Sequence, residues 1–206
     1  MTLFRCTLRV LMTAGCFASA LATAEATAQT PRPVAVGIAV GATMPISEFA
    51  DDTKAGYHGA AFLQYEPARG IWGVRGEVSY HRSDFTDEAL ADVGAPPGAD
   101  IINSVTHVGA TALLIGGNRG RSVTPYALAG LGMYRVSVSA SSGAFSLSAA
   151  ENGFGFNGGA GMRIGRGAGV FIEARYHQFS ITAEDESGAD IKSTYKMIPV
   201  TVGVRF

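Results

Sequence analysis

The chain has 206 residues, of which 47% are hydrophobic and 16% are charged, and its formal net charge is -1 at pH 7. This length fits one domain of moderate size. A slightly acidic balance with dispersed arginines disfavours nucleic acid as a partner, because phosphate backbones are bound by clustered cations.

The amino terminus has the three parts of a secretory signal peptide. Arg5 and Arg9 precede an apolar run that ends at Leu21, and the small-residue stretch LATAEATAQT follows. This order of basic, apolar and small residues is typical of a cleaved export signal. We expect a signal peptide over residues 1–28 and a mature domain over residues 29–206.

Both cysteines lie inside the predicted signal peptide. Cys16, in TAGC, suggests a lipoprotein signal as an alternative, but the apolar stretch directly before it is short. With Cys6 and Cys16 removed, the mature chain is expected to have no disulfide and no thiolate site. No later segment approaches the roughly 18–20 apolar residues of a membrane helix. The periplasm, the medium and a membrane barrel remain as destinations.

The rest of the chain alternates between apolar and small or polar residues, which predicts β-strands rather than helices. Eight such segments are expected, over residues 34–44, 56–66, 71–82, 102–116, 123–139, 153–165, 168–182 and 192–206. No segment shows a convincing helical stripe with a period of 3.6 residues. The predicted class is therefore all-β.

The connections between these strands alternate in length. PARG, GNRGRS and GRGAG are short, whereas the segments that start near Ser47, Ser83, Ser139 and Ala183 are longer and polar. The short turns contain Arg69, Arg119, Arg121 and Arg166. The long connections contain nearly all acids of the mature chain: Glu48, Asp51, Asp52, Asp84, Asp87, Glu88, Asp92, Asp100, Glu151, Glu184, Asp185, Glu186 and Asp190. Short turns on one side and long loops on the other are typical of an outer-membrane barrel.

Each predicted strand has two chemically different faces. In VFIEARYHQF, Val170 and Ile172 share one face, while Glu173, Arg175 and His177 share the other. A soluble, lipocalin-like barrel would turn the apolar face inward, and a membrane barrel would turn it outward. Alternation alone does not distinguish the two arrangements.

Aromatic spacing favours the membrane arrangement. Three pairs of aromatic residues on the predicted apolar faces lie eight residues apart: Tyr57 and Tyr65, Trp72 and Tyr80, and Tyr126 and Tyr134. At the usual tilt, eight residues of strand cover roughly 20 Å of height, comparable to the distance between two aromatic girdles. We therefore predict girdles formed by Tyr57, Tyr65, Trp72, Tyr80, Tyr126, Tyr134 and Phe206.

These features make the chain resemble the OmpA/OmpX-like family of small outer-membrane β-barrels. The resemblance rests on the signal peptide, the alternating strands and the closing segment IPVTVGVRF, which ends in Phe206. It implies an eight-stranded antiparallel closed transmembrane β-barrel with short periplasmic turns and longer extracellular loops. It also implies that the barrel-assembly machinery reads the last strand, although Val204 stands where the family often has an aromatic residue.

Sequence patterns for catalysis are weak. GFGFNG, residues 153–158, matches a nucleotide-binding glycine pattern but lies inside a predicted strand. His177 and Ser180 fall on opposite faces of a strand, and His81 and Ser83, with Glu77 nearby, have no identifiable oxyanion donors. We predict neither an enzyme nor a cofactor, and the serious enzyme alternative is a lipid-modifying hydrolase.

The side chains on the polar faces of the strands predict a filled lumen. The expected charge network consists of Arg75, Glu77, Arg135, Arg163, Glu173, Arg175 and Arg205. Four histidines lie on the same faces, namely His58, His81, His107 and His177. They are interpreted as hydrogen-bonded fillers, because a metal site needs three or four ligands around one ion.

The predicted function is a structural scaffold in the outer membrane of a Gram-negative bacterium. It would present acidic surface loops for envelope integrity or for adhesion and other surface interactions. A narrow, porin-like pore is the alternative, and a lipid-modifying enzyme is the second alternative. Expected partners are outer-membrane lipids, lipopolysaccharide and the barrel-assembly machinery, and the barrel is expected to be a monomer.

Overall fold

The computed structural model describes residues 33–67, 70–92, 100–117, 122–142, 145–165, 169–184 and 190–206. The predicted signal peptide lies outside these ranges. So do the four arginines predicted in the short turns, and the loop acids Asp185 and Glu186. No helix among the described residues is long and apolar enough to cross a membrane.

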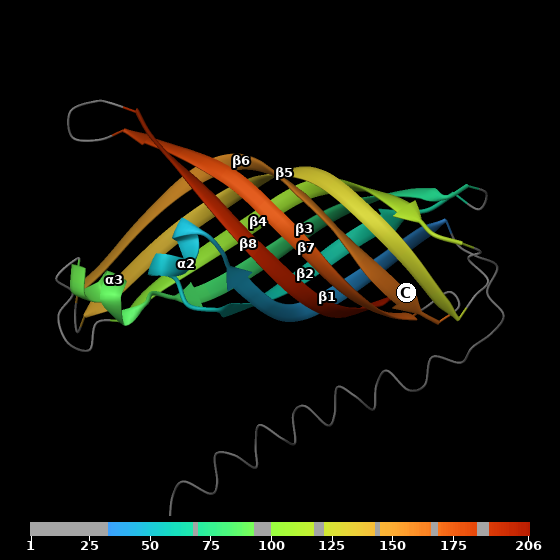
Figure 1. The fold of residues 1–206 in the computed structure, drawn as a ribbon, viewed down its shortest axis with the longest axis horizontal. Helices are drawn as coiled ribbons and strands as arrows, with labels where there is room; N and C mark the ends of the chain where they lie inside the picture. The colour runs from blue at the N-terminus through green and yellow to red at the C-terminus, as the bar shows by residue number, and fades with distance from the viewer. Residues whose placement is uncertain are drawn as a thin grey trace, which may run out of the picture. The chain divides into compact units, whose positions relative to one another are not determined.

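Eight strands form a closed antiparallel barrel in which each strand pairs with its sequence neighbours and β1 closes against β8 (Figure 1). The strands are β1 (Val34–Pro45), β2 (Gly56–Tyr65), β3 (Trp72–Asp84), β4 (Asp100–Ile115), β5 (Val123–Ser142), β6 (Phe145–Ile164), β7 (Gly169–Glu184) and β8 (Asp190–Arg205). This confirms the predicted class, strand number and order. Closure pairs every strand on both sides over most of its length, so the barrel wall has no open edge there.

The apolar face points outward, as expected for a barrel with lipid around it. On β1, Ile38 is 58% exposed and Val40 is 68% exposed, while Ala35 and Ala39 on the opposite parity are buried. The outer surface is thus a continuous apolar belt, which would be unstable in water. We call the outward-facing apolar residues of β1–β8 the apolar belt; on β3 this belt runs from Trp72 to Tyr80. The charged face of the same strands lies inside.

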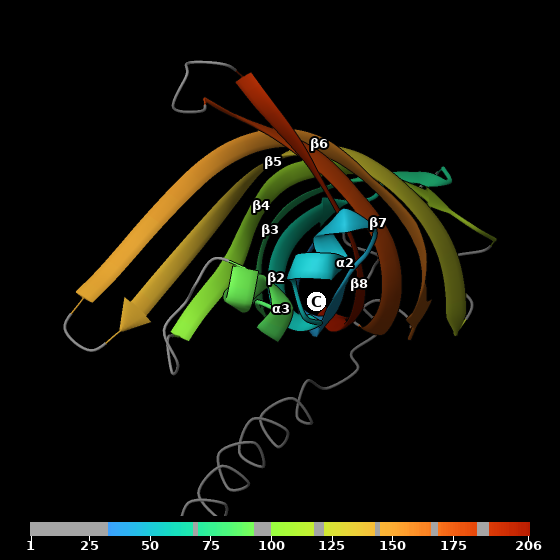
Figure 2. The ribbon, with the colours of Figure 1, turned by 60° about the vertical axis from the view of Figure 1, so that its left-hand side comes forward.

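The strands differ in length: β5 and β6 have 20 residues each, against 10 to 13 in β1, β2 and β3. The wall formed by β5 and β6 therefore extends beyond those strands at the end where the predicted long loops lie, and the β7–β8 hairpin projects there as well (Figure 2). The prediction of a long loop starting near Ser139 is wrong. Its serine and alanine residues continue the two-residue alternation, so β5 and β6 stay paired as far as Ser142 and Phe145. Glu151 therefore lies in β6 and not in a loop.

Two short helices, which the sequence did not predict, occupy the first two long connections. They are α2 (Glu48–Asp52), between β1 and β2, and α3 (Asp87–Asp92), between β3 and β4. Five and six residues are too few to show a helical stripe. The two connections are joined by a bridge between Thr53 and Phe85 and by an ion pair of 2.8 Å between Lys54 Nζ and Asp87 Oδ1.

Candidate functional site

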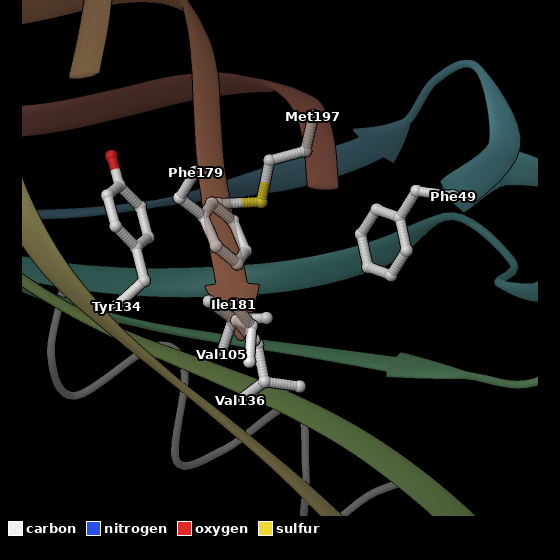
Figure 3. Close-up of a cluster of buried hydrophobic side chains, with 7 residues drawn as sticks. All are labelled: Phe49, Val105, Tyr134, Val136, Phe179, Ile181 and Met197. Carbon is white, nitrogen blue, oxygen red and sulfur yellow. The ribbon is translucent and has the colours of Figure 1, made fainter. Parts of the chain in front are cut away.

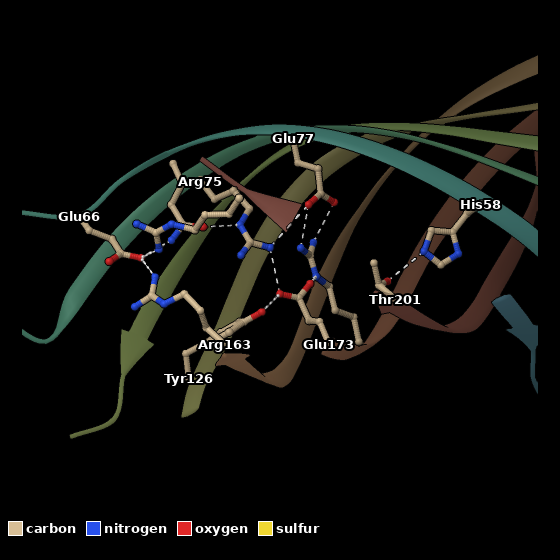
Figure 4. A network of polar contacts seen from close by, with 11 residues as sticks. His58, Glu66, Arg75, Glu77, Tyr126, Arg163, Glu173 and Thr201 are labelled. Atoms are coloured by element: carbon tan, nitrogen blue, oxygen red, sulfur yellow. Dashed lines mark hydrogen bonds and ion pairs between the residues drawn. The ribbon is translucent and has the colours of Figure 1, made fainter. Parts of the chain in front are cut away.

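The candidate site is the barrel lumen, whose side chains form successive layers. Its central layer contains four ionised side chains from the third and seventh strands (Figure 4). Arg175 binds Glu77 with both terminal nitrogens, at 2.9 and 2.7 Å, and also donates to Glu173. Arg75 Nη1 lies 2.9 Å from Glu173 Oε2. Two arginines and two glutamates therefore balance each other's charge, as buried ions require.

A second charged layer lies closer to the short turns and is organised by Glu66, just beyond the end of β2. Glu66 accepts hydrogen bonds from Arg163, at 2.8 Å, and from Arg205 and Gln64. Gln64 in turn accepts a hydrogen bond of 2.8 Å from Arg75 Nε, which joins the two layers. Glu66 and Gln64 were not predicted as lumen residues, although both lie an even number of residues from Phe62 and therefore face inward with it.

Aromatic rings enclose the central layer. The Arg75 guanidinium lies 4.4 Å from the centre of the Phe62 ring and 5.7 Å from that of Phe171. The Tyr126 hydroxyl donates a hydrogen bond of 2.8 Å to Glu173. Stacking a weakly hydrated guanidinium on aromatic faces stabilises it where water is scarce.

The four predicted lumen histidines meet in the next layer, towards the long loops. His58 and His81 stack with ring centres 4.9 Å apart, and His107 and His177 meet edge to face at 5.4 Å. Thr43 Oγ1 lies within hydrogen-bonding distance of both His58 Nδ1, at 3.0 Å, and His81 Nδ1, at 2.8 Å.

The other histidine contacts also involve hydroxyls. His58 Nε2 lies 2.9 Å from Thr201 Oγ1, and His177 Nδ1 lies 2.9 Å from Tyr134 Oη. Hydroxyl partners suit neutral imidazoles, because a hydroxyl can donate or accept according to the tautomer. Within the described part of the chain, no group of histidine, cysteine or acidic side chains has the geometry to hold a metal ion.

An apolar plug closes the lumen on the side of the histidines that faces the long loops, and Figure 3 shows its side chains. It consists of Phe49, Val105, Tyr134, Val136, Phe179, Ile181 and Met197, all buried. The Tyr134 and Phe179 rings stack at 4.2 Å, and Phe49 from α2 packs edge to face on Tyr195 at 5.1 Å. The first long connection thus contributes a side chain that covers the mouth of the barrel.

Little empty space remains between these layers. The cavity beside the central charged layer has a volume of about 20 Å³, and the cavity beside Glu66 has a volume of about 10 Å³. Each has room for about one water molecule. A narrow eight-stranded barrel is expected to be filled in this way.

Three predicted positions are wrong, all on β5. Arg135 points outward and is exposed, so it does not belong to the lumen network. Tyr126 is 7% exposed and Tyr134 is 0% exposed, so both lie inside and neither belongs to a girdle. In YALAGLGMYRV, residues 126–136, the even-numbered and the odd-numbered residues are both mostly apolar. The alternation therefore did not identify the inner face of β5. Inside the barrel, the two hydroxyls reach Glu173 and His177.

The remaining predicted residues have the expected orientation. Arg75, Glu77, Arg163, Glu173, Arg175 and Arg205 are buried in the lumen, as are His58, His81, His107 and His177. Tyr57, Tyr65, Trp72, Tyr80 and Phe206 are exposed on the outer surface. The Tyr65 and Trp72 rings also contact each other, at 6.2 Å.

The catalytic patterns weighed in the sequence do not form accessible sites. GFGFNG lies within β6 with no helix after it, which the nucleotide-binding pattern requires. His81 Nε2 lies 3.1 Å from Ser79 rather than near Ser83, and His81 Nδ1 contacts Thr43 instead of a carboxylate. The His81 side chain lies below the apolar plug, away from lipid.

Comparisons with known proteins agree with this geometry. A search of the curated proteins found no match. Neisserial surface protein A has a similar structure, with 17% identity and a TM-score of 0.52 over 86% of this chain and 98% of that one. A major outer membrane protein from Thermus thermophilus has 13% identity and a TM-score of 0.54 over 85% of this chain and 100% of its own. Residues 11–206 match the outer membrane protein beta-barrel domain, so the chain belongs to this family of bacterial outer-membrane proteins.

Proposed function

We propose that this protein is a sealed outer-membrane scaffold that presents a projecting sheet and acidic loops for interactions at the cell surface. The observation that carries the proposal is the combination of a filled lumen with strands that continue beyond the apolar belt. A lumen with two charged layers, a histidine layer and an apolar plug gives ions and substrates no path. The surface, rather than the interior, is then the part available to a partner.

The projecting wall has an unpaired backbone edge. Within the described residues, pairing between β6 and β7 ends at Gly153 and Ile181, and β7 continues towards Glu184 paired only with β8. The part of β6 from Phe145 to Asn152 therefore pairs with β5 alone. Free backbone groups on an exposed strand can pair with an extended polypeptide, which supports adhesion by strand addition.

The other surface elements are acidic. α2 and α3 contain Glu48, Asp51, Asp52, Asp87, Glu88 and Asp92, and of these Asp87 pairs with Lys54. Such a surface favours basic partners or divalent cations. A basic polypeptide that adopts an extended conformation fits both the acidic helices and the free edge.

Shortening the β5–β6 hairpin tests this proposal. Residues 137–150, which include most of the unpaired edge, are replaced by an Asn-Gly turn that joins the cross-strand partners Val136 and Glu151. The probe is a short synthetic peptide of alternating valine and lysine, measured on intact cells. A matched variant keeps the hairpin and neutralises two of the three acids of α3, as D87N/E88Q.

Binding should fall strongly in the shortened variant and partly in D87N/E88Q, and a peptide with proline in place of valine should not bind. Equal binding to the shortened and the intact protein, at equal amounts in the membrane, would contradict strand addition. If D87N/E88Q lost binding and the shortened variant did not, the acidic surface alone would bind the peptide and strand addition would be rejected.

The lipid-modifying enzyme and the pore receive no support from the lumen geometry. His81, Ser83 and His177, which could act in hydrolysis, are buried inside the barrel, and Ser180 lies on the opposite face of β7 from His177. The volumes of about 20 and 10 Å³ are far below that of an acyl chain or a hydrated ion path. We propose instead that the lumen is structural and that the barrel works as a monomer.

Phe206 is proposed as the residue through which the barrel-assembly machinery recognises the last strand. It is exposed, and its backbone pairs with Val36 at 3.2 and 2.8 Å, so β1 and β8 close next to it. Changing Phe206 to aspartate should reduce the amount of folded barrel in the outer membrane and leave unfolded chain in the periplasm. The measurement is the heat-dependent shift of folded barrels on gels. Wild-type assembly of Phe206→Asp, with Val34→Ala as the control, would reject this role.

A further inference from the structure

Two arginines point outward at the loop-side edge of the apolar belt. On β3 the outward residues run from Trp72 through Tyr80, and Arg82 is the next one. On β5 they run from Val123 through Met133, and Arg135 is the next one. Each arginine therefore follows directly after the run of apolar outward-facing residues on its strand, at the end near the long loops.

Cross-strand register places polar side chains between the two arginines. Thr106 on β4 pairs with both Tyr80 and Arg135, and Arg135 pairs with Asn152 on β6. Arg82 stands one outward position further along β3. Strand spacing and rise put the Cα atoms of Arg82 and Arg135 about 12 Å apart. The patch thus offers two guanidinium groups with a hydroxyl and an amide beside them.

These two arginines differ from the arginines inside the barrel. Arg75, Arg163, Arg175 and Arg205 each have a carboxylate partner in the lumen. Within the described residues, neither Arg82 nor Arg135 forms an ion pair. Among the described side chains that face outward on β3–β6, the one acid is Asp84, a further position away from the belt.

We propose that Arg82 and Arg135 bind a lipid headgroup that contains two phosphates, in the outer leaflet of the membrane. A guanidinium matches a phosphate with two parallel hydrogen bonds, and the reduced water content at the boundary strengthens the contact. The acyl chains of this lipid lie on the belt below, over Val78, Val108 and Met133. The site rests on the outer-membrane location that the family gives, and it is independent of the proposed adhesion.

The test measures lipid affinity with the folded barrel in phosphatidylcholine nanodiscs. The probe is fluorescent diphosphorylated lipid A, compared with the same lipid after removal of its phosphates. The variant is R82Q/R135Q. The control is K192Q/K196Q, which removes the same charge from outward positions of β8. The heat-dependent gel shift verifies that each variant is folded.

R82Q/R135Q should bind the probe about 10- to 30-fold more weakly, which corresponds to about 1 kcal/mol for each cation near a lipid surface. K192Q/K196Q should change affinity by less than about threefold, and lipid without phosphates should bind the wild type as weakly as it binds R82Q/R135Q. If the glutamine variant does not fold, R82K/R135K keeps the charges, loses the planar fork and should bind severalfold more weakly.

Three results would overturn the site. Equal losses in the two charge pairs would indicate general attraction to an anionic surface. If the lipid without phosphates bound as tightly as the diphosphorylated lipid, the phosphates would not be what the protein recognises. Full competition by inorganic pyrophosphate at the affinity of the lipid would indicate a free anion as the ligand instead of a headgroup.

Discussion

Changing Glu173 to glutamine should destabilise the barrel by about 3–5 kcal/mol, the usual effect of removing one partner from a buried charge pair. Glu173 accepts hydrogen bonds from Arg75, Arg175 and Tyr126 and is buried inside the lumen. Its loss leaves two arginines against one remaining carboxylate, Glu77. The measurement is the free energy of unfolding by denaturant in detergent or lipid vesicles.

A double-mutant cycle separates the charge pair from general damage. Arg75 is the partner to combine with Glu173→Gln, because Arg75 Nη1 lies 2.9 Å from Glu173 Oε2. The change Arg75→Met removes that charge, so the double variant should recover part of the lost stability. We expect a coupling of about 1 kcal/mol or more. Strict additivity of the two changes would show that no balanced network exists.

The second large effect concerns the outer face. Replacing Val202 by arginine should destabilise the folded barrel by about 2–4 kcal/mol if the residue lies near the middle of the bilayer. Val202 is 50% exposed and pairs with Val40 and Ile172, both exposed and apolar. A charge there would have to leave water for hydrocarbon. The measurement is unfolding in vesicles.

Thr201 provides the matched control, because it neighbours Val202 and faces the lumen, where it contacts His58. Thr201→Asn keeps a polar group in a polar environment and should be tolerated better than Val202→Arg. If Val202→Arg folded into bilayers as readily as Thr201→Asn, the assignment of the inner and outer faces would be wrong.

Strands with one polar and one apolar face were predictable from the sequence. On β3, Arg75 and Glu77 alternate with Val74 and Val78, and this contrast separates the two faces. The spacing of the aromatic residues then predicted that the apolar face meets lipid. On β5 both faces are apolar, and Tyr126, Tyr134 and Arg135 were therefore placed on the wrong sides. Glu173 and His177 are buried and need hydrogen-bond partners, which the hydroxyls of Tyr126 and Tyr134 provide. The sequence of β5 alone does not contain this requirement.

The composition of the lumen was largely predictable, but its pairings were not. Parity placed Glu77 and Arg175 inside, yet they come from β3 and β7, which are not neighbouring strands. Contacts across the lumen depend on barrel tilt and stagger, which a strand's own sequence does not encode. Phe49 was not predicted as part of the plug, because it lies in a connection whose sequence has no strand pattern and so gives no inward or outward direction.

Recording ion current across a planar bilayer that contains the purified barrel tests the central claim, a sealed lumen, most directly. The packed charges and the plug predict no steady conductance above that of the bare bilayer at moderate voltage. Changing Phe49 and Met197 to alanine opens the plug but leaves the layers around Glu173 and Glu66 intact, so this variant should also stay closed. A steady current through the unmodified protein, with uniform single-channel steps, would contradict the sealed lumen and establish a pore.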